Sequence, residues 1–137
     1  MYVFPVDEIE KVLASAQTAF PKEASGLLLR QEFGRFMLLS VTETSNEENT
    51  PLSFRIGDEV IEKIAKCLKG SGKAICGVSH SHVLGRAWPS SVDCAATKER
   101  GDLWLIYSVA YCNLRLFKWD GMTFERTRFQ ILPSVGT

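Results

Sequence analysis

The sequence predicts an α/β fold in which a mixed, mostly antiparallel sheet is flanked by helices. Two observations support this prediction. Apolar residues recur at helical spacing in two stretches of the first seventy residues, and strand-like segments alternate with them before dominating the C-terminal part. The 137 residues match the usual size of one domain, so we expect residues 1–137 to form a single domain.

Helical spacing of apolar residues predicts two amphipathic helices in the first half of the chain. The first spans Pro5 to Phe20, carries acidic residues in its first turns and is stopped by Pro21. The second spans Asp58 to Leu68 and is followed closely by a glycine. A third helix is expected to begin at Pro89 and to run to about residue 100.

Strand-like segments fill most of the remaining sequence, apart from a polar loop at residues 45–53. The predicted strands are Ser25 to Arg30, Arg35 to Thr42, Ala74 to Ser79, Leu103 to Val109, Tyr111 to Trp119 and Met122 to Leu132. Gly34 marks the turn between the first two, and Asp120-Gly121 marks a hairpin turn between the last two. The nearly continuous apolar run after Leu103 favours a strand that is covered on both faces.

Composition excludes several classes of protein. Hydrophobic residues make up 45% and charged residues 23% of the chain, which is typical of a globular protein and not of a disordered one. Sixteen basic and sixteen acidic side chains cancel, so nucleic acid is not an expected partner. No apolar run approaches the roughly 20 residues of a membrane span, and no secretory signal is recognisable, so we expect a cytoplasmic protein.

The four cysteines are far apart and contain no C-x-x-C pair. They are Cys67, Cys76, Cys94 and Cys112. A disulfide scaffold would be denser in cysteine, and a four-cysteine zinc site would show paired spacing. We therefore expect reduced, mostly buried thiols.

The two histidines of the chain, His80 and His82, stand two residues apart at the end of a predicted strand. Side chains at that spacing share one face of a strand, so the two imidazoles can converge on one metal ion. A catalytic zinc site takes three protein ligands, and Asp93 is a candidate for the third. Each feature also has a plainer interpretation: the histidines can be incidental, and Ser90-x-x-Asp93 can be a helix capping box.

Taken together, these residues match one motif. His80-x-His82, seven further residues, Ser90, two further residues and Asp93 resemble the JAMM signature of the MPN-type zinc metalloproteases. Upstream, the segment Pro21-Lys-Glu-Ala-Ser-Gly-Leu-Leu resembles the family's P-x-E-x-x-G-x-L, which carries its catalytic glutamate. The order of elements fits along nearly the whole chain. Because long insertions are absent, the chain resembles the compact stand-alone prokaryotic type.

The resemblance implies a role for each matching residue. His80, His82 and Asp93 would hold one Zn²⁺ per chain. Glu23 would accept a proton from the attacking water and later deliver it to the leaving amine, as general base and then acid. Ser90 would donate its hydroxyl to the oxyanion of the tetrahedral intermediate.

The resemblance also implies a substrate class. The expected activity is hydrolysis of an amide bond after the C-terminal tail of a ubiquitin-like or sulfur-carrier protein, with the tail lying along an exposed edge strand. The segment from Asn46 to Arg55 is a candidate wall of that site. The alternatives are a catalytically inactive MPN-type interaction scaffold, a metal-binding protein without hydrolysis, and a phage or cell-wall associated JAMM peptidase. An inactive scaffold typically lacks some of the five motif residues, and all five are present here.

The chain departs from the family pattern directly after the second histidine. Many relatives have proline there and this chain has Val83, which affects the rigidity of the loop and not metal ligation. Arg86 and Trp88 either line the mouth of the site, or Trp88 packs beneath the loop. Cys94 follows Asp93 but points about 100° around the predicted helix, which favours a place in the core.

Overall fold

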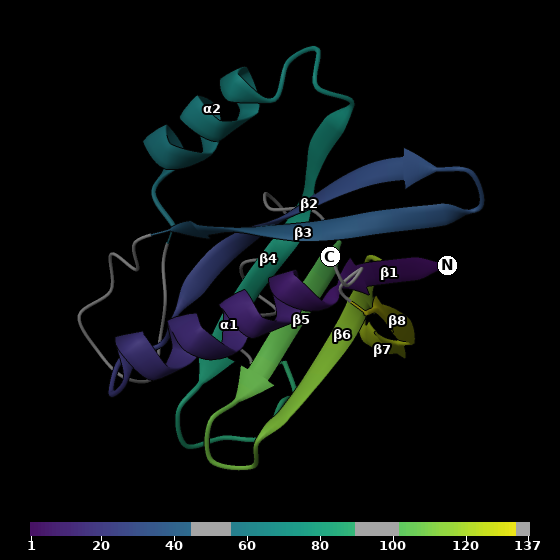
Figure 1. Cartoon of the computed structure of the whole chain (residues 1–137). Helices are drawn as coiled ribbons and strands as arrows, with labels where there is room; N and C mark the ends of the chain where they lie inside the picture. The colour runs from purple at the N-terminus through teal and green to yellow at the C-terminus, as the bar shows by residue number, and fades with distance from the viewer. Residues whose placement is uncertain (45–55, 90–101, 134–137) are drawn as a thin grey trace.

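The computed structural model describes residues 1–44, 56–89 and 102–133 (Figure 1). In these ranges the elements are β1 (Tyr2–Pro5), α1 (Val6–Ala19), β2 (Ser25–Phe33), β3 (Phe36–Thr44), α2 (Asp58–Cys67), β4 (Lys73–His82), β5 (Leu103–Ser108), β6 (Asn113–Trp119), β7 (Phe124–Thr127) and β8 (Phe129–Leu132). The whole of the predicted loop at residues 45–53 lies outside the described residues, as do residues 90–100 of the predicted third helix.

The described strands form one sheet in the order β7-β6-β5-β4-β2-β3-β1-β8. Four neighbouring pairs are antiparallel, namely β2–β3, β2–β4, β5–β6 and β6–β7. Three are parallel, namely β1–β3, β1–β8 and β4–β5. The predicted mixed, mostly antiparallel sheet flanked by helices is therefore confirmed.

The sheet is curled, because its two edge strands are neighbours in the sequence. β7 pairs with β6 at one edge and ends at Thr127, whereas β8 pairs with β1 at the other edge and begins at Phe129. A single residue, Arg128, separates them, so the two edges must lie close together, as Figure 1 shows beside β1. The prediction of one strand from Met122 to Leu132 is wrong, since the chain changes pairing partner in its middle.

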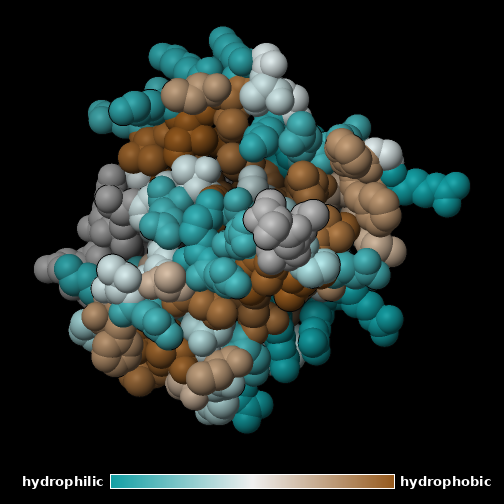
Figure 2. All heavy atoms as spheres, viewed as in Figure 1, coloured by the Kyte–Doolittle hydropathy of each residue, from teal (hydrophilic) through white to brown (hydrophobic). Residues whose placement is uncertain are grey.

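Helix α1 packs on one face of the sheet through Ile9 and Val12, and helix α2 packs on the other through Val60, Ile61 and Ile64. Apolar side chains gather beneath α2, and its outer surface is hydrophilic (Figure 2). The core cluster under α1 contains Phe4, Leu28, Leu39, Val41, Cys76, Leu103, Leu105 and Leu116. The cluster on the α2 face contains Leu27, Ile56, Val78, Ala87, Trp104, Ile106 and Phe117.

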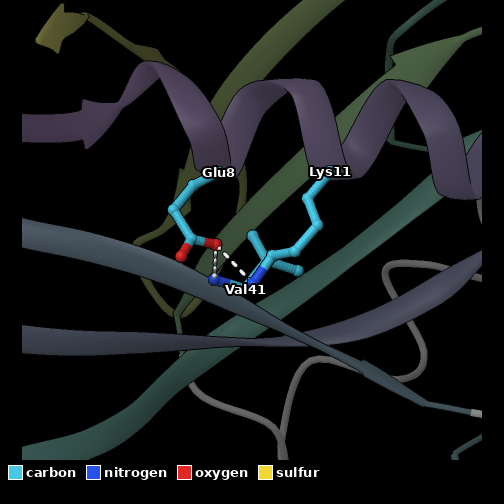
Figure 3. Close-up of polar contacts among 3 residues, drawn as sticks. All are labelled: Glu8, Lys11 and Val41. Carbon is cyan, nitrogen blue, oxygen red and sulfur yellow. Dashed lines mark hydrogen bonds and ion pairs between the residues drawn. The ribbon is translucent and has the colours of Figure 1, made fainter. Parts of the chain in front are cut away.

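A side chain of α1 completes the hydrogen bonding of β3 where strand pairing stops. β1 pairs with β3 only as far as Leu38, because the chain turns into α1 after Pro5. The backbone N–H of Val41 donates instead to Glu8 Oε2 at 3.0 Å, and that oxygen also lies 2.8 Å from Lys11 Nζ (Figure 3). This contact fixes the start of α1 to the sheet, since a buried backbone N–H requires a partner.

Strand β4 contains a β-bulge. Leu28 pairs with Gly77 and Leu29 pairs with Ile75, so Cys76 is an additional residue on β4. A bulge of one residue reverses which face the following side chains occupy. The side chains beyond the bulge therefore follow a different alternation from those before it.

The bulge determines the face on which the two histidines lie. Val78, directly after the bulge, packs in the α2-side cluster together with Trp104. His80 contacts the Trp104 ring edge-on, with ring centroids 5.6 Å apart, and His82 follows on the same face. β4 also runs further than the predicted end at Ser79, because pairing with β5 continues to His82.

Two further expectations need correction. The prediction of mostly buried thiols is wrong, because Cys67 and Cys112 are exposed; Cys76 is buried, burial raises its pKa to about 12, and Cys94 lies outside the described residues. Strand β1 was not predicted, because four residues ending in Pro5 carry too little pattern to indicate a strand. In the described part of the chain, neither helix has the length and apolar character needed to span a bilayer.

The first testable prediction concerns Gly77, which pairs with Leu103 at the start of β5. A Cβ atom at this position would lie 1.8 Å from the backbone oxygen of Leu103, so either strand would have to shift. We expect Gly77→Ala to lower the free energy of unfolding by at least about 2 kcal/mol, measured by urea denaturation. Gly85→Ala is the matched control: its Cβ would come no closer than 3.9 Å to His82 Nδ1, and a change within about 0.5 kcal/mol is expected. Equal stability of the two variants would contradict the close approach.

Candidate metal centre

Three buried side chains with metal-binding chemistry meet at one end of the sheet. Glu23, which precedes β2, lies beside His80 and His82 at the end of β4. Their ligand atoms all lie within 4.8 Å of one another, and each side chain is at most 9% exposed. The strand spacing predicted that the two imidazoles share a face, and the structure confirms that they lie together, with ring centroids 4.7 Å apart.

Two hydrogen bonds attach the Glu23 segment to the histidine strand. The backbone N–H of Ala24 donates to Ser81 Oγ at 2.8 Å, and the backbone N–H of Ser81 donates to the Ala24 oxygen at 3.1 Å. Ser81 lies between the two histidines and is itself buried. It therefore fixes the residue after Glu23 to the part of the chain that carries both imidazoles.

His82 makes a hydrogen bond that orients its ring. Its Nδ1 lies 2.8 Å from the backbone oxygen of Arg86. Because that oxygen only accepts, Nδ1 carries the hydrogen, which makes Nε2 the ring atom that can ligate a metal ion. A second hydrogen bond of this kind is the usual support for a metal-binding histidine.

The loop after His82 is held by the end of β5. The backbone N–H of Val109 donates to the His82 oxygen at 2.9 Å. The fully buried Ser108 donates its hydroxyl to the Gly85 oxygen at 2.6 Å. The carbonyl that orients His82 thus belongs to a constrained loop, although this chain has Val83 where many relatives have proline.

The donor set fits zinc. Two imidazoles and one carboxylate are ligands that Zn²⁺ takes at catalytic sites, and the surroundings of His80 are aromatic and apolar. The described residues supply two imidazoles and Glu23, and the predicted ligand Asp93 lies outside them.

The comparisons with known proteins identify the family. Residues 5–122 match the family model described as prokaryotic homologs of the JAB domain. The chain belongs to this family. JAB domains include metallopeptidases and inactive scaffold proteins, so membership alone does not establish activity. No curated protein matches the sequence.

Solved structures share the JAB-domain fold. A solution structure from Desulfitobacterium hafniense has a TM-score of 0.83 and 23% identity, covering 98% of this chain and 95% of that one. A JAB1/MPN domain protein from Archaeoglobus fulgidus has a TM-score of 0.64 and 19% identity, covering 96% and 99%. A solution structure from Salinibacter ruber has a TM-score of 0.69 and 20% identity, covering 96% and 92%. At these identities the likeness concerns the fold.

The structure places some of the predicted site residues of this JAB domain and not others. It brings Glu23, His80 and His82 together, whereas Ser90, Asp93 and the whole expected wall at residues 46–55 lie outside the described residues. Sequence reasoning missed Ser81. The signal was present, because a residue between two histidines on a strand points to the opposite face, toward whatever segment lies there.

The second prediction tests the attachment of Glu23 to the histidine strand. Ser81→Ala removes the acceptor of the Ala24 N–H and leaves that group without its partner, so amide exchange at Ala24 should accelerate about tenfold or more. Hydrogen exchange followed by NMR measures this directly. Ser71→Ala is the control, because the Ser71 hydroxyl bonds the Leu68 oxygen far from the site. Unchanged exchange at Ala24 in the Ser81 variant would show that Ser81 does not hold this segment.

Proposed function

We propose that this JAB domain is a zinc-dependent peptidase or isopeptidase, which hydrolyses an amide bond after the C-terminal tail of a ubiquitin-like or sulfur-carrier protein. The observation that carries the proposal is that Glu23, His80 and His82 are buried and lie close together in a member of this family. A carboxylate beside two imidazoles is a donor set for a divalent cation, and the sequence also contains Ser90 and Asp93 of the family motif, whereas inactive scaffolds typically lack some of these residues.

Three ligands are proposed for the zinc ion: His80, His82 and Asp93. When bound, zinc supplies Lewis acidity that lowers the pKa of a water molecule toward ~7 and polarises a carbonyl. The hydrogen bond from His82 Nδ1 to the Arg86 oxygen fixes the orientation of that ring.

Glu23 is proposed to move the proton. Its carboxylate accepts a proton from the attacking water as the new C–O bond forms, and returns it to the amine nitrogen as the C–N bond breaks. The position suits this role, because Glu23 is 4% exposed yet its segment borders a pocket of about 370 Å³ that reaches the surface. Ser90 is proposed to donate its hydroxyl to the oxyanion of the tetrahedral intermediate.

The end of β3 offers a place for an extended substrate tail. Beyond Leu38, β1 no longer pairs with β3, and the Val41 N–H is taken by Glu8. Glu43 and Thr44 lie further along this edge and line the same pocket as Glu23. An extended tail can add to such an edge through main-chain hydrogen bonds, which would lead its end toward Glu23 and the histidines.

The third prediction concerns the zinc ligands. The protein purified with zinc should contain about one Zn²⁺ per chain, and Asp93→Ala should lose most of it, because two imidazoles alone hold zinc weakly. Elemental analysis after dialysis measures the ratio. Asp102→Ala is a control carboxylate outside the proposed ligand set. Full zinc content in the Asp93 variant would show that Asp93 is not a ligand and would favour Glu23 as the third.

The fourth prediction separates catalysis from metal binding at Glu23. Glu23→Gln keeps the shape but removes the proton acceptor, so cleavage of a ubiquitin-like fusion should fall at least ~10²-fold while zinc stays bound. Cleavage rate and zinc content are measured on one preparation, with the exposed Glu32→Gln as the matched control. Loss of zinc would make Glu23 a ligand. Full activity with normal zinc would remove Glu23 from the mechanism.

A further inference from the structure

A second pocket lies beside the metal centre on the side away from β3. Its volume is about 170 Å³. It is lined by Arg86, Ala87, Trp88, Tyr111, Asn113 and Arg115. The sequence left two places for this loop, either at the mouth of the site or with Trp88 packed beneath it. Both features are present: Arg86 and Trp88 line this pocket. The Trp88 ring also packs on Phe117, with ring centroids 5.3 Å apart.

Strand register places the pocket next to the histidines on the same face of the sheet. His80 pairs with Ile106 on β5, which pairs with Arg115 on β6. Directly paired residues share a face, and neighbouring strands lie about 4.8 Å apart, so the backbones of His80 and Arg115 are about 10 Å apart. In the same way, His82 pairs with Ser108 on β5, which pairs with Asn113 on β6. A side chain next to a scissile bond at the histidines is therefore within reach of the pocket.

The pocket contains two guanidinium groups, each held against an aromatic ring. The Arg86 group lies 5.6 Å from the centroid of the Tyr111 ring, and the Arg115 group lies 5.4 Å from that of Trp88. Within the described ranges, neither arginine forms an ion pair with a carboxylate. Contact with a ring restricts each guanidinium at little cost in hydration, and leaves its N–H donors available to a ligand.

Two cations that line one pocket repel each other, so their arrangement is better explained by the binding of an anion than by a contribution to stability. Planar guanidinium groups recognise carboxylates through paired, charge-assisted hydrogen bonds. The pocket also contains an unmet acceptor, since Asn113 Oδ1 is buried and has no hydrogen-bond partner among the described residues. An amino-acid residue that brings both a carboxylate and an N–H group matches these features, and the volume suits one residue.

We infer that this pocket binds a carboxylate of the substrate on the leaving-amine side of the scissile bond. The inference rests on the proposed function for its orientation: if the tail lies along β3, the leaving group extends over β5 and β6. The carboxylate is either an acidic side chain or the terminal carboxylate of a short leaving group. In both cases Arg86 and Arg115 determine specificity and take no part in bond cleavage.

The test is a binding measurement on the zinc-loaded protein. Two blocked peptides, acetyl-Gly-Gly-Glu-Gly-amide and acetyl-Gly-Gly-Gln-Gly-amide, are titrated while ¹⁵N NMR follows the Trp88 indole and the arginine Nε signals. The Glu peptide should shift these signals and bind at least about tenfold more tightly than the Gln peptide, with a preference that falls as salt is added. Acetyl-Gly-Gly-Gly with a free terminus, compared with its amide, distinguishes a terminal carboxylate from an acidic side chain.

Substitutions assign the binding to this pocket. Arg115→Gln and Arg86→Gln should each remove most of the preference for the carboxylate. Arg115→Lys should keep only part of that preference, because an ammonium group keeps the charge but cannot form the paired hydrogen bonds of a guanidinium. Arg35→Gln, at the exposed turn between β2 and β3, is the matched control and should bind like the wild type. Equal binding of the Glu and Gln peptides, or an unchanged preference in both pocket variants, would overturn the inference.

Failure of the proposed function would give a different result. Binding of the peptides requires no hydrolysis, so a protein without peptidase activity would still show the carboxylate preference if the pocket is a carboxylate site. An active peptidase that cleaves Glu and Gln substrates with equal kcat/KM, and binds both peptides equally, would retain the proposed function and lose this inference. The two hypotheses therefore stand or fall on separate measurements.

Discussion

The pairing of β2 with β4 is the interaction on which the candidate site depends. Glu23 and the two histidines are separated by more than fifty residues; Glu23 lies two residues before β2 begins, and both histidines lie at the end of β4. Antiparallel pairing brings Ser25 opposite His80, and the two Ala24–Ser81 hydrogen bonds continue the contact by one step. A slip of one residue would turn both imidazoles to the α1 face and leave the carboxylate without them.

The bulge at Cys76 is part of the same constraint. It places Ile75, before the bulge, and Val78, after it, in one apolar cluster although they are an odd number of positions apart. Gly77, beside the bulge, lets β5 approach closely enough to continue the sheet. The site therefore lies on a closely packed part of the sheet, which helps a buried polar cluster to keep its geometry.

Local pattern was sufficient to predict the parts of the structure that depend on nearby residues. The helix before Pro21, the turn at Gly34 and the histidine pair all follow from spacing within a few residues. The bulge and the separation of β7 from β8 depend on strands distant in the sequence. The residue pattern around Arg128 does not indicate that the chain stops pairing with β6 and begins to pair with β1. In the site, the motif indicated Glu23, His80 and His82, whereas the support from Ser81 and from the Arg86 backbone oxygen depends on tertiary contacts.

The charges on the two sides of the histidines differ, although the chain as a whole is neutral. On the β3 side, Glu23 and Glu43 line the pocket proposed for the tail, with Lys22 as the neighbouring cation. On the β6 side, Arg86 and Arg115 stand without carboxylate partners in the described part of the chain. A substrate that is neutral on one side of its scissile bond and acidic on the other would bind in one orientation only, because the reverse would place its carboxylate beside Glu23. Electrostatic repulsion would then contribute to specificity as much as attraction does.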